Sequence, residues 1–335
     1  MQLDHVIHRL HQKASRLEIV YSKVTQIDLK DTMHIGTEAQ PIRATVLDSS
    51  FNPPTRAHLS LALLATPDIS ESTLLLLSVR NADKQLKPGD APYLERLEMM
   101  SHFADDLARA QMEANWYPTP KWALVDPSSF KHQPLSRNLW PVVLTAAISE
   151  PTFVGKSTVL HEILPRSWPS LGRDSDHQDG KQVHPQFQFT FLMGWDTITR
   201  FFDPKFYPSP EAMSESLETF FYVERSSIIC SRRPKASFRK PQDIDAMCSD
   251  ERAEEDAFLK SNMVKPYVDS GVIKVLDIGN EENLISSTRI RESLKETVDG
   301  YNLEWTSLTT PAVARYIQKQ RAYSVPWDLC LDGNP

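Results

Sequence analysis

The sequence predicts an α/β fold in which a parallel sheet of about six strands carries helices on both faces. Apolar stretches of strand length alternate with helical stretches six times along the chain. One of them, residues 73–79, is largely apolar without alternation, which is typical of a strand covered on both faces, as in parallel sheets. We therefore expect one Rossmann-like, doubly wound domain over residues 41–325, with a helical extension at 1–40 and a tail at 326–335.

The composition excludes several classes of protein. A chain of 335 residues with 40% hydrophobic content suffices for one large domain with insertions. The net charge of −7 argues against a nucleic-acid surface. No apolar run approaches the roughly 18 residues of a membrane span, and the first residues lack the apolar run of a secretion signal. The three cysteines, Cys230, Cys248 and Cys330, lie far apart without metal spacing, which favours a reduced compartment, the cytoplasm, the nucleus or both.

The first elements form a strand–helix–strand unit. Residues 1–40 are expected to hold an amphipathic helix because apolar residues recur at helical spacing, at Val6, Leu10, Leu17 and Val20. The strand 44–48, the helix 57–65 and the strand 73–79 follow. Together they make a βαβ unit, the building block of a parallel sheet.

The turn between the strand 44–48 and its helix is the first candidate site. Ser49-Ser50 and Pro53-Pro54 break the strand pattern. The free N–H groups and dipole of the helix start favour an anion there. Thr55 and His58 are three residues apart and share a helix face, so a hydroxyl and an imidazole point to the same place. The same residues also fit a strand–turn–helix connection that binds no ligand, with a capping threonine and a surface histidine.

The next segment combines a basic loop, a helix and a third strand. Residues 80–89 carry three cations, Arg80, Lys84 and Lys87. A helix begins at about Pro92, which suits a first helical position, and residues 121–127 are expected to be the third strand. Residues 128–150 contain prolines and a short apolar stretch, and we expect them to be an inserted loop.

Residues 155–158, with the sequence Gly-Lys-Ser-Thr, invite comparison with a phosphate-binding loop. The full motif needs a glycine five residues before Gly155, and that position is Glu150. We therefore reject this motif and expect Ser157 or Thr158 near the start of a helix over 159–164. A second insertion is expected at 165–186, which is rich in proline, serine, glycine and aspartate.

The later strands also end in polar residues. The strand 187–193 ends in Gly194-Trp195-Asp196, and the strand 226–231 ends at Arg232. A sixth strand is expected at 271–278. The following Ser286-Ser287-Thr288 would cluster N–H and O–H donors at a helix start, and Arg291, three residues beyond Thr288, adds a guanidinium fork for phosphate oxygens. A last helix is expected over 312–320.

The first of these motifs resembles the signature of nucleotidyltransferases, G-S-F-N-P-x-[HT]-x-G-H. The residues at its matching positions are Ser50, Phe51, Asn52, Pro53, Thr55 and His58. Ser49 and Ala57 depart from it, since the family has glycine at both places, and a Cβ there limits how closely the backbone approaches phosphate.

Three further motifs resemble the remaining signatures of that superfamily, in family order. They are the lysine loop followed by Arg96, the Gly194–Asp196 stretch, and residues 285–291, which match I-S-S-T-x-I-R without departure. The whole pattern is most similar to the nicotinamide mononucleotide adenylyltransferase family, of which the chain looks like a divergent eukaryotic, fungal branch.

The resemblance implies roles for particular residues. Those expected to act on the reacting phosphates are Thr55, His58, Lys87 and Arg291. Those expected to bind the nucleotide are Ser49, Ser50, Phe51, Asn52, Gly194, Asp196, Arg232, Ser286, Ser287 and Thr288. Those expected to bind substrate are Lys84 (the alternative to Lys87), Arg96, Trp122, Trp195 and Tyr207. Tyr207 would stack on the pyridine ring.

The activity that the resemblance implies is adenylyl transfer from ATP to nicotinamide mononucleotide, which forms NAD⁺ and pyrophosphate. Mg²⁺ would be bound mainly through the ATP phosphates, with no metal site made by the protein. The nicotinic-acid analogue as substrate and the oligomeric state stay open. Two alternatives stay open as well: a cytidylyltransferase of the same superfamily, and a partner protein that binds or hydrolyses ATP without transferring it.

Overall fold

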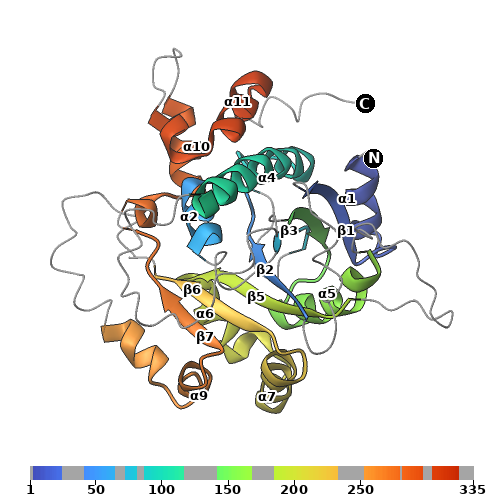
Figure 1. Cartoon of the computed structure of the whole chain (residues 1–335), viewed down its shortest axis with the longest axis vertical. Coiled ribbons are helices and arrows are strands. Elements are labelled where there is room, and N and C mark those ends of the chain that lie inside the picture. The colour runs from blue at the N-terminus through green and yellow to red at the C-terminus, as the bar shows by residue number, and fades with distance from the viewer. Residues whose placement is uncertain are drawn as a thin grey trace.

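The structure is a seven-stranded sheet between two layers of helices (Figure 1). It is a computed structural model. The residues that it describes are 3–24, 41–64, 72–80, 87–116, 142–167, 185–232, 253–279, 281–296 and 304–323. None of the helices in these ranges is long and apolar enough to cross a membrane.

The sheet has the strand order β1-β4-β3-β2-β5-β6-β7. All neighbouring strands are parallel except β1, which runs antiparallel to β4. The strands are β1 (Leu17–Val24), β2 (Ile42–Asp48), β3 (Ser72–Ser78), β4 (Val142–Ile148), β5 (Phe187–Gly194), β6 (Ser227–Ser231) and β7 (Ile273–Leu276). In chain order the six parallel strands are arranged 3-2-1-4-5-6, the doubly wound order in which ligands bind at the switch between the first and fourth strands. Here that switch lies between β2 and β5, which confirms the predicted fold class.

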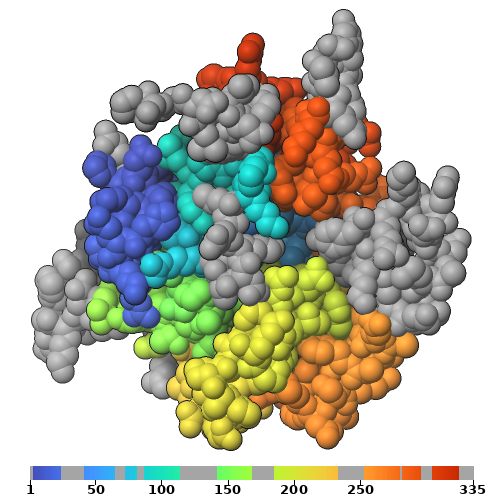
Figure 2. All heavy atoms as spheres, turned by 180° about the vertical axis from the view of Figure 1, so that it is seen from behind, coloured from blue at the N-terminus to red at the C-terminus, as the bar shows by residue number. Residues whose placement is uncertain are grey.

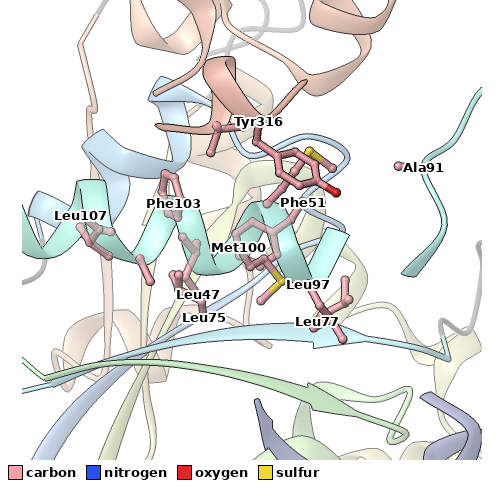
Figure 3. Close-up of a cluster of buried hydrophobic side chains, with 14 of the residues drawn as sticks. Leu47, Phe51, Leu75, Leu77, Ala91, Leu97, Met100, Phe103, Leu107 and Tyr316 are labelled. Carbon is pink, nitrogen blue, oxygen red and sulfur yellow. The ribbon is translucent and has the colours of Figure 1, made fainter. Parts of the chain in front are cut away.

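One face of the sheet, here called the α4 face, carries the helices that come from the two ends of the chain. They are α1 (Leu3–His11), α2 (Arg56–Leu64), α4 (Tyr93–Trp116), α10 (Ser287–Glu296) and α11 (Pro311–Gln320). Their apolar sides cover Leu47, Leu75 and Leu77 of the sheet in one buried cluster (Figure 3). In that view Phe103 and Leu107 lie on α4, which runs above the strands.

The opposite face, here called the α5 face, carries α5 (Phe153–Ser167), α6 (Trp195–Phe201), α7 (Pro210–Glu218), a π-helical turn (Thr219–Val223) and α9 (Lys265–Asp269). Their buried residues pack on Ala44, Val46 and Leu76, which alternate along the strands with the residues of the α4 face. From behind, residues 204–223 (yellow) and 253–279 (orange) lie side by side along the lower edge (Figure 2). Short 3₁₀ turns are found at Pro204–Phe206, Glu282–Leu284 and Glu304–Leu308.

The structure corrects two of the predicted elements. The apolar stretch at 142–148 is not part of an inserted loop. It is β4, and every one of its residues is buried because both faces of the sheet are covered there. The strand predicted at 121–127 lies outside the described residues.

The second correction concerns the N-terminal extension, which is not all helix. The helix α1 ends at His11, and Leu17–Val24 forms β1 along the edge of β4. Lys13 has a left-handed φ of 58°, which ends the helix. Ile19 and Val20 are β-branched and favour a strand, so the helical spacing of Leu17 and Val20 was misleading.

Candidate active site

The candidate site begins where β2 ends, beside the switch point. Residues 49–55 form a turn between β2 and α2, and Thr55 caps the helix by accepting a hydrogen bond from His58 N at 3.3 Å. Phe51 has a left-handed φ of 43° and is fully buried, with its ring 5.3 Å from the imidazole of His58. This aromatic residue anchors the turn in the core of the α4 face, so the polar atoms on either side of it are held in place.

The hydrogen bonds of His58 determine where its proton lies. Thr55 N donates to His58 Nδ1 at 3.0 Å, and the Thr55 hydroxyl lies 2.8 Å from the same nitrogen. Since Nδ1 accepts a backbone N–H, the neutral ring carries its proton on Nε2. That nitrogen lies 2.9 Å from Ser49 Oγ. The imidazole therefore offers an N–H donor on the side of the turn where β2 ends.

The serine-rich start of α10 packs directly against this turn. Ser286 Oγ accepts from Arg289 N at 3.1 Å and caps the helix. Ser287 Oγ donates to the Pro53 carbonyl at 2.7 Å, and Arg291 Nη1 donates to the Asn52 carbonyl at 2.6 Å. Two motifs that are 239 residues apart in the chain thus form one donor-rich site.

A cluster of buried polar residues holds the 49–55 turn by hydrogen bonds. Asn52 Nδ2 donates to Asp90 Oδ1 at 2.6 Å, and Ala91 N donates to Asn52 Oδ1 at 3.0 Å. Arg96 is 5% exposed, and its guanidinium donates to the carbonyls of Ala91 and Ser50 at 2.7 and 3.4 Å. Burial lowers the pKa of Arg96, while the Asp90 carboxylate acts in the opposite direction. Arg96 therefore holds the turn in this structure, and its predicted contact with substrate stays a prediction.

The lysine loop lies at the edge of the same site. The side chain of Lys87 is exposed, and its backbone N–H donates to Asp90 Oδ2 at 3.0 Å. Gly89, with a left-handed φ of 84°, lies beside the exposed ammonium of Lys295 from α10. Lys295 is a cation that the sequence did not single out, because only the packing of α10 on this loop brings it there. Lys84 and Trp122 lie outside the described residues.

The strands on the other side of the switch bring further predicted residues to the same edge of the sheet. Gly194 ends β5 and precedes α6, and a Cβ there would meet no atom. Asp196 is exposed in the first turn of α6, so its carboxylate is accessible to solvent. Arg232 follows β6, with its Nε 3.7 Å from Glu255 Oε2.

Two predicted substrate residues are engaged in packing on the α5 face. The Trp195 ring lies edge-on to Phe258, with centroids 5.5 Å apart. The Tyr207 hydroxyl donates to the Phe201 carbonyl at 2.7 Å, and burial raises the pKa of Tyr207 to about 12. These contacts do not bring either ring to the Thr55–His58 cluster, and stacking by Tyr207 stays a prediction.

A buried ion pair lies on the α5 side of the same strand end. Lys156 Nζ contacts Asp48 Oδ2 at 2.5 Å, with side chains 2% and 7% exposed, and Ser78 Oγ donates to Asp48 Oδ1 at 3.1 Å. Lys156 lies inside α5, so the Gly-Lys-Ser-Thr stretch is helix and not a phosphate-binding loop. The sequence patterns did not predict this ion pair. The only sign of it in the sequence is a lysine among the apolar residues of a helix.

The described residues contain no group of three histidine, cysteine, aspartate or glutamate side chains that could hold a metal ion. The carboxylates nearest the turn, Asp48 and Asp90, are each engaged by a cation and by other donors. The donors that remain around the turn are imidazole, hydroxyl, guanidinium and ammonium groups. Such a set suits a polyanion and not a metal held by the protein alone.

The chain is similar to several known proteins. The family model described as cytidylyltransferase-like matches residues 46–293. A protein of Schizosaccharomyces pombe (strain 972), provisionally named nicotinamide mononucleotide adenylyltransferase, is 29% identical over 253 residues, which are 74% of each chain. Nicotinic acid mononucleotide adenylyltransferase from Plasmodium falciparum, solved with NaAD, aligns at 13% identity and a TM-score of 0.42 over 84% of this chain and 98% of its own. A Vibrio parahaemolyticus structure provisionally titled nicotinate-nucleotide adenylyltransferase aligns at 12% identity and a TM-score of 0.32, over 84% and 95%.

Proposed function

Since this chain belongs to the cytidylyltransferase-like family, we propose that it is an enzyme that transfers the adenylyl group of ATP to nicotinamide mononucleotide or its nicotinic-acid analogue. The observation that carries the proposal is the junction of the two motifs, where Arg291 donates to Asn52 O and Ser287 to Pro53 O. The matched residues 46–293 include both motifs. The name of the Schizosaccharomyces pombe relative supports the choice of a pyridine mononucleotide as acceptor.

The reaction is an in-line displacement at phosphorus. An oxygen of the 5′-phosphate of the mononucleotide attacks the α-phosphorus of ATP and forms a new P–O bond. The bond from the α-phosphorus to the bridging oxygen breaks, and pyrophosphate leaves with that electron pair. Because the attacking phosphate is already an anion, the protein needs no nucleophile and no general base. Its work is to hold the two substrates in line and to stabilise the charge.

The donors around the 49–55 turn suit that work. His58 Nε2–H would donate to the triphosphate once a phosphate oxygen replaces Ser49 Oγ as its partner. The hydroxyl of Thr288, which is exposed at the first turn of α10, adds a donor beside Ser286 and Ser287. Arg291 and Lys87 would neutralise the pyrophosphate as it leaves. Mg²⁺, when bound to the ATP phosphates, would supply further charge neutralisation.

The nucleotide sugar would lie across the switch point. Asp196 follows β5, the parallel neighbour of β2, and its carboxylate is exposed. An acidic residue in this place commonly accepts hydrogen bonds from ribose hydroxyls. We infer that Asp196 binds the ribose hydroxyls of the nucleotide in the same way.

We also propose that the reaction takes place in the cytoplasm, the nucleus or both. The support for this location is that the three cysteines lie far apart in the sequence, which favours a reduced compartment.

A second candidate function is nucleotide binding without transfer. Ser49 stands where the superfamily has glycine, and its hydroxyl occupies the Nε2 side of His58 at 2.9 Å. A serine that keeps this bond when ATP is present would withhold the donor from the phosphate. Such a protein would bind ATP, or hydrolyse it slowly, and would form no dinucleotide.

A substrate panel separates these functions. The purified chain is incubated with Mg²⁺ and either ATP or CTP, each with nicotinamide mononucleotide, with nicotinic acid mononucleotide, or alone. The dinucleotide is measured by chromatography and pyrophosphate by a coupled assay. We expect dinucleotide and pyrophosphate in equal amounts with ATP and a mononucleotide. Product formed only with CTP would assign a cytidylyltransferase, and ATP binding without a dinucleotide would contradict the proposal.

A further inference from the structure

A tyrosine from the C-terminal segment contributes a hydroxyl to the 49–55 turn. The helix α11 ends at Gln320, and Arg321 follows in a left-handed conformation, with φ of 53°. Tyr323 is also left-handed, with φ of 68°. The chain therefore reverses after α11, and the Tyr323 hydroxyl donates to Asn52 Oδ1 at 2.9 Å, across 271 residues of sequence.

This bond gives the amide oxygen of Asn52 its second donor. An amide oxygen has two lone pairs, and Asn52 Oδ1 accepts from Ala91 N at 3.0 Å as well as from Tyr323. The amide nitrogen donates to Asp90 Oδ1 at 2.6 Å. Asn52 is 3% exposed, so its amide has little access to solvent that could replace a lost partner. Its orientation is fixed by two separate segments of the chain, residues 90–91 and the segment that carries Tyr323.

The backbone of Asn52 links this orientation to the phosphate donors. The Asn52 carbonyl accepts from Arg291 Nη1 at 2.6 Å. The neighbouring Pro53 carbonyl accepts from Ser287 Oγ at 2.7 Å. The Asn52 side chain ties this stretch of backbone to Asp90 and Ala91. Loss of its fixed orientation would therefore let the two carbonyls move, together with the two donors that rest on them. Preorganised donors stabilise charge only when they are already in place.

We propose that Tyr323 is a positioning residue, which fixes the 49–55 turn and Arg291 through its hydrogen bond to Asn52, so that the C-terminal segment completes the active site. This inference rests on the proposed function. It assigns a role in transfer to a residue that lies outside the matched range 46–293.

The hydroxyl is not required to attach the C-terminal segment to the domain. α11 is held on α4 by other bonds, since Ala312 N donates to Asp106 Oδ2 at 2.7 Å and the Tyr316 hydroxyl donates to Glu98 Oε2 at 2.5 Å. Val313 and Ile317 are buried in the core of the α4 face. Removal of one oxygen from Tyr323 should therefore leave the fold intact while it frees Asn52.

The test compares Tyr323→Phe with Tyr316→Phe in the full-length chain. Both variants lose one tyrosine hydroxyl bond in the same region, but only Tyr323 contacts the turn. We expect Tyr323→Phe to lower kcat for dinucleotide formation about tenfold, with the KM for the mononucleotide unchanged within twofold. Tyr316→Phe should keep kcat within twofold of wild type, and the two variants should melt within a few degrees of each other.

Each other outcome overturns the inference. A wild-type kcat in Tyr323→Phe would show that the hydroxyl does not position the turn. An equal loss of kcat in both variants would show a general effect of stability. The wild-type rate tests the proposed function by itself. If wild type forms no dinucleotide, Mg-ATP affinity measured by calorimetry takes the place of kcat: weaker binding in Tyr323→Phe alone supports the inference, and unchanged binding overturns it.

Discussion

The starts of α2 and α5 look alike in sequence and differ in the structure. Both helices follow a strand of the sheet, and both starts carry small hydroxyl residues with a basic residue nearby. At α2 the cap is Thr55, and the imidazole of His58 and the guanidinium of Arg291 converge on the turn before it. At α5 the chain's own Glu150 carboxylate accepts from Thr152 N and Oγ1 at 3.2 and 3.0 Å and covers Gly155.

The difference shows what an anion site needs beyond its residue types. The donors at the start of α5 already have an acidic partner, the Glu150 carboxylate. The lysine of this helix, Lys156, is buried in an ion pair with Asp48. Around the start of α2, hydroxyls and backbone carbonyls that a phosphate can replace or join are partners of His58, Ser287 and Arg291. The ion pairs there, Arg56 with Glu282 and Arg291 with Asp90, join side chains that are 17–43% exposed, unlike the buried pair of α5. We therefore expect the start of α5 to govern stability and the start of α2 to govern function.

The largest expected effect is on stability, at α5. Lys156→Met leaves the Asp48 carboxylate buried without its cation, which should lower the free energy of unfolding by about 3–5 kcal/mol. Chemical denaturation measures this change in the free energy of unfolding. Lys260→Met, which breaks an exposed ion pair with Asp256, should cost less than about 1 kcal/mol. The double variant Asp48→Leu/Lys156→Met should be more stable than Lys156→Met. A loss below 1 kcal/mol in Lys156→Met would remove the contrast between the two helix starts.

The next effect is on turnover, at α2. His58→Ala removes the Nε2–H donor and should lower kcat about 10²-fold, the usual size for one lost donor to transition-state charge. Its unfolding midpoint should stay near that of wild type because His58 is only partly buried. Steady-state kinetics measure kcat, and His8→Ala, at an exposed position of α1, serves as the control. Full turnover in His58→Ala would place the chemistry elsewhere.

A smaller effect is expected at the lysine loop. Lys87→Ala removes an exposed cation from the edge of the α2 site and should weaken Mg-ATP binding about five- to tenfold, a loss of about 1 kcal/mol. The loss should shrink as salt is added, because the charge is exposed to solvent. Calorimetry on Lys84→Ala in parallel decides which of the two lysines belongs to the site. Lys205→Ala, which removes an exposed lysine on the α5 face, should bind as wild type does.

The last effect is on the pH dependence of stability, at His161 of α5. Burial lowers the pKa of His161, in α5, to about 4 from its ordinary 6.5. Between pH 6.5 and 4 the unfolded chain therefore binds a proton that the folded chain does not, and this contribution to stability is lost as the pH falls through that window. The slope is at most about 1.4 kcal/mol per pH unit. The free energy of unfolding of His161→Leu, measured by chemical denaturation at several pH values, should lack this slope. His5→Leu, at an exposed position, should keep it.

Sequence patterns sufficed for the fold class and for the pairing of motifs. Largely apolar stretches of strand length revealed β2, β3, β5 and β6 within a few residues of their bounds, because a strand covered on both faces is mostly apolar. The short donor-rich motifs were visible because caps and turns depend on neighbouring residues. The same reasoning failed at β4, since an apolar stretch beside prolines resembles a loop until its neighbours in the sheet are known.

What the sequence determined by itself was therefore local: strand periodicity, helix caps and the order of the four motifs. The tertiary structure decided which groups meet. Lys156 and Asp48 are 108 residues apart, and Tyr323 and Asn52 are 271 apart. No pattern along the chain encodes such contacts, because a side chain acquires its partner only when sheet order and helix packing bring distant segments together.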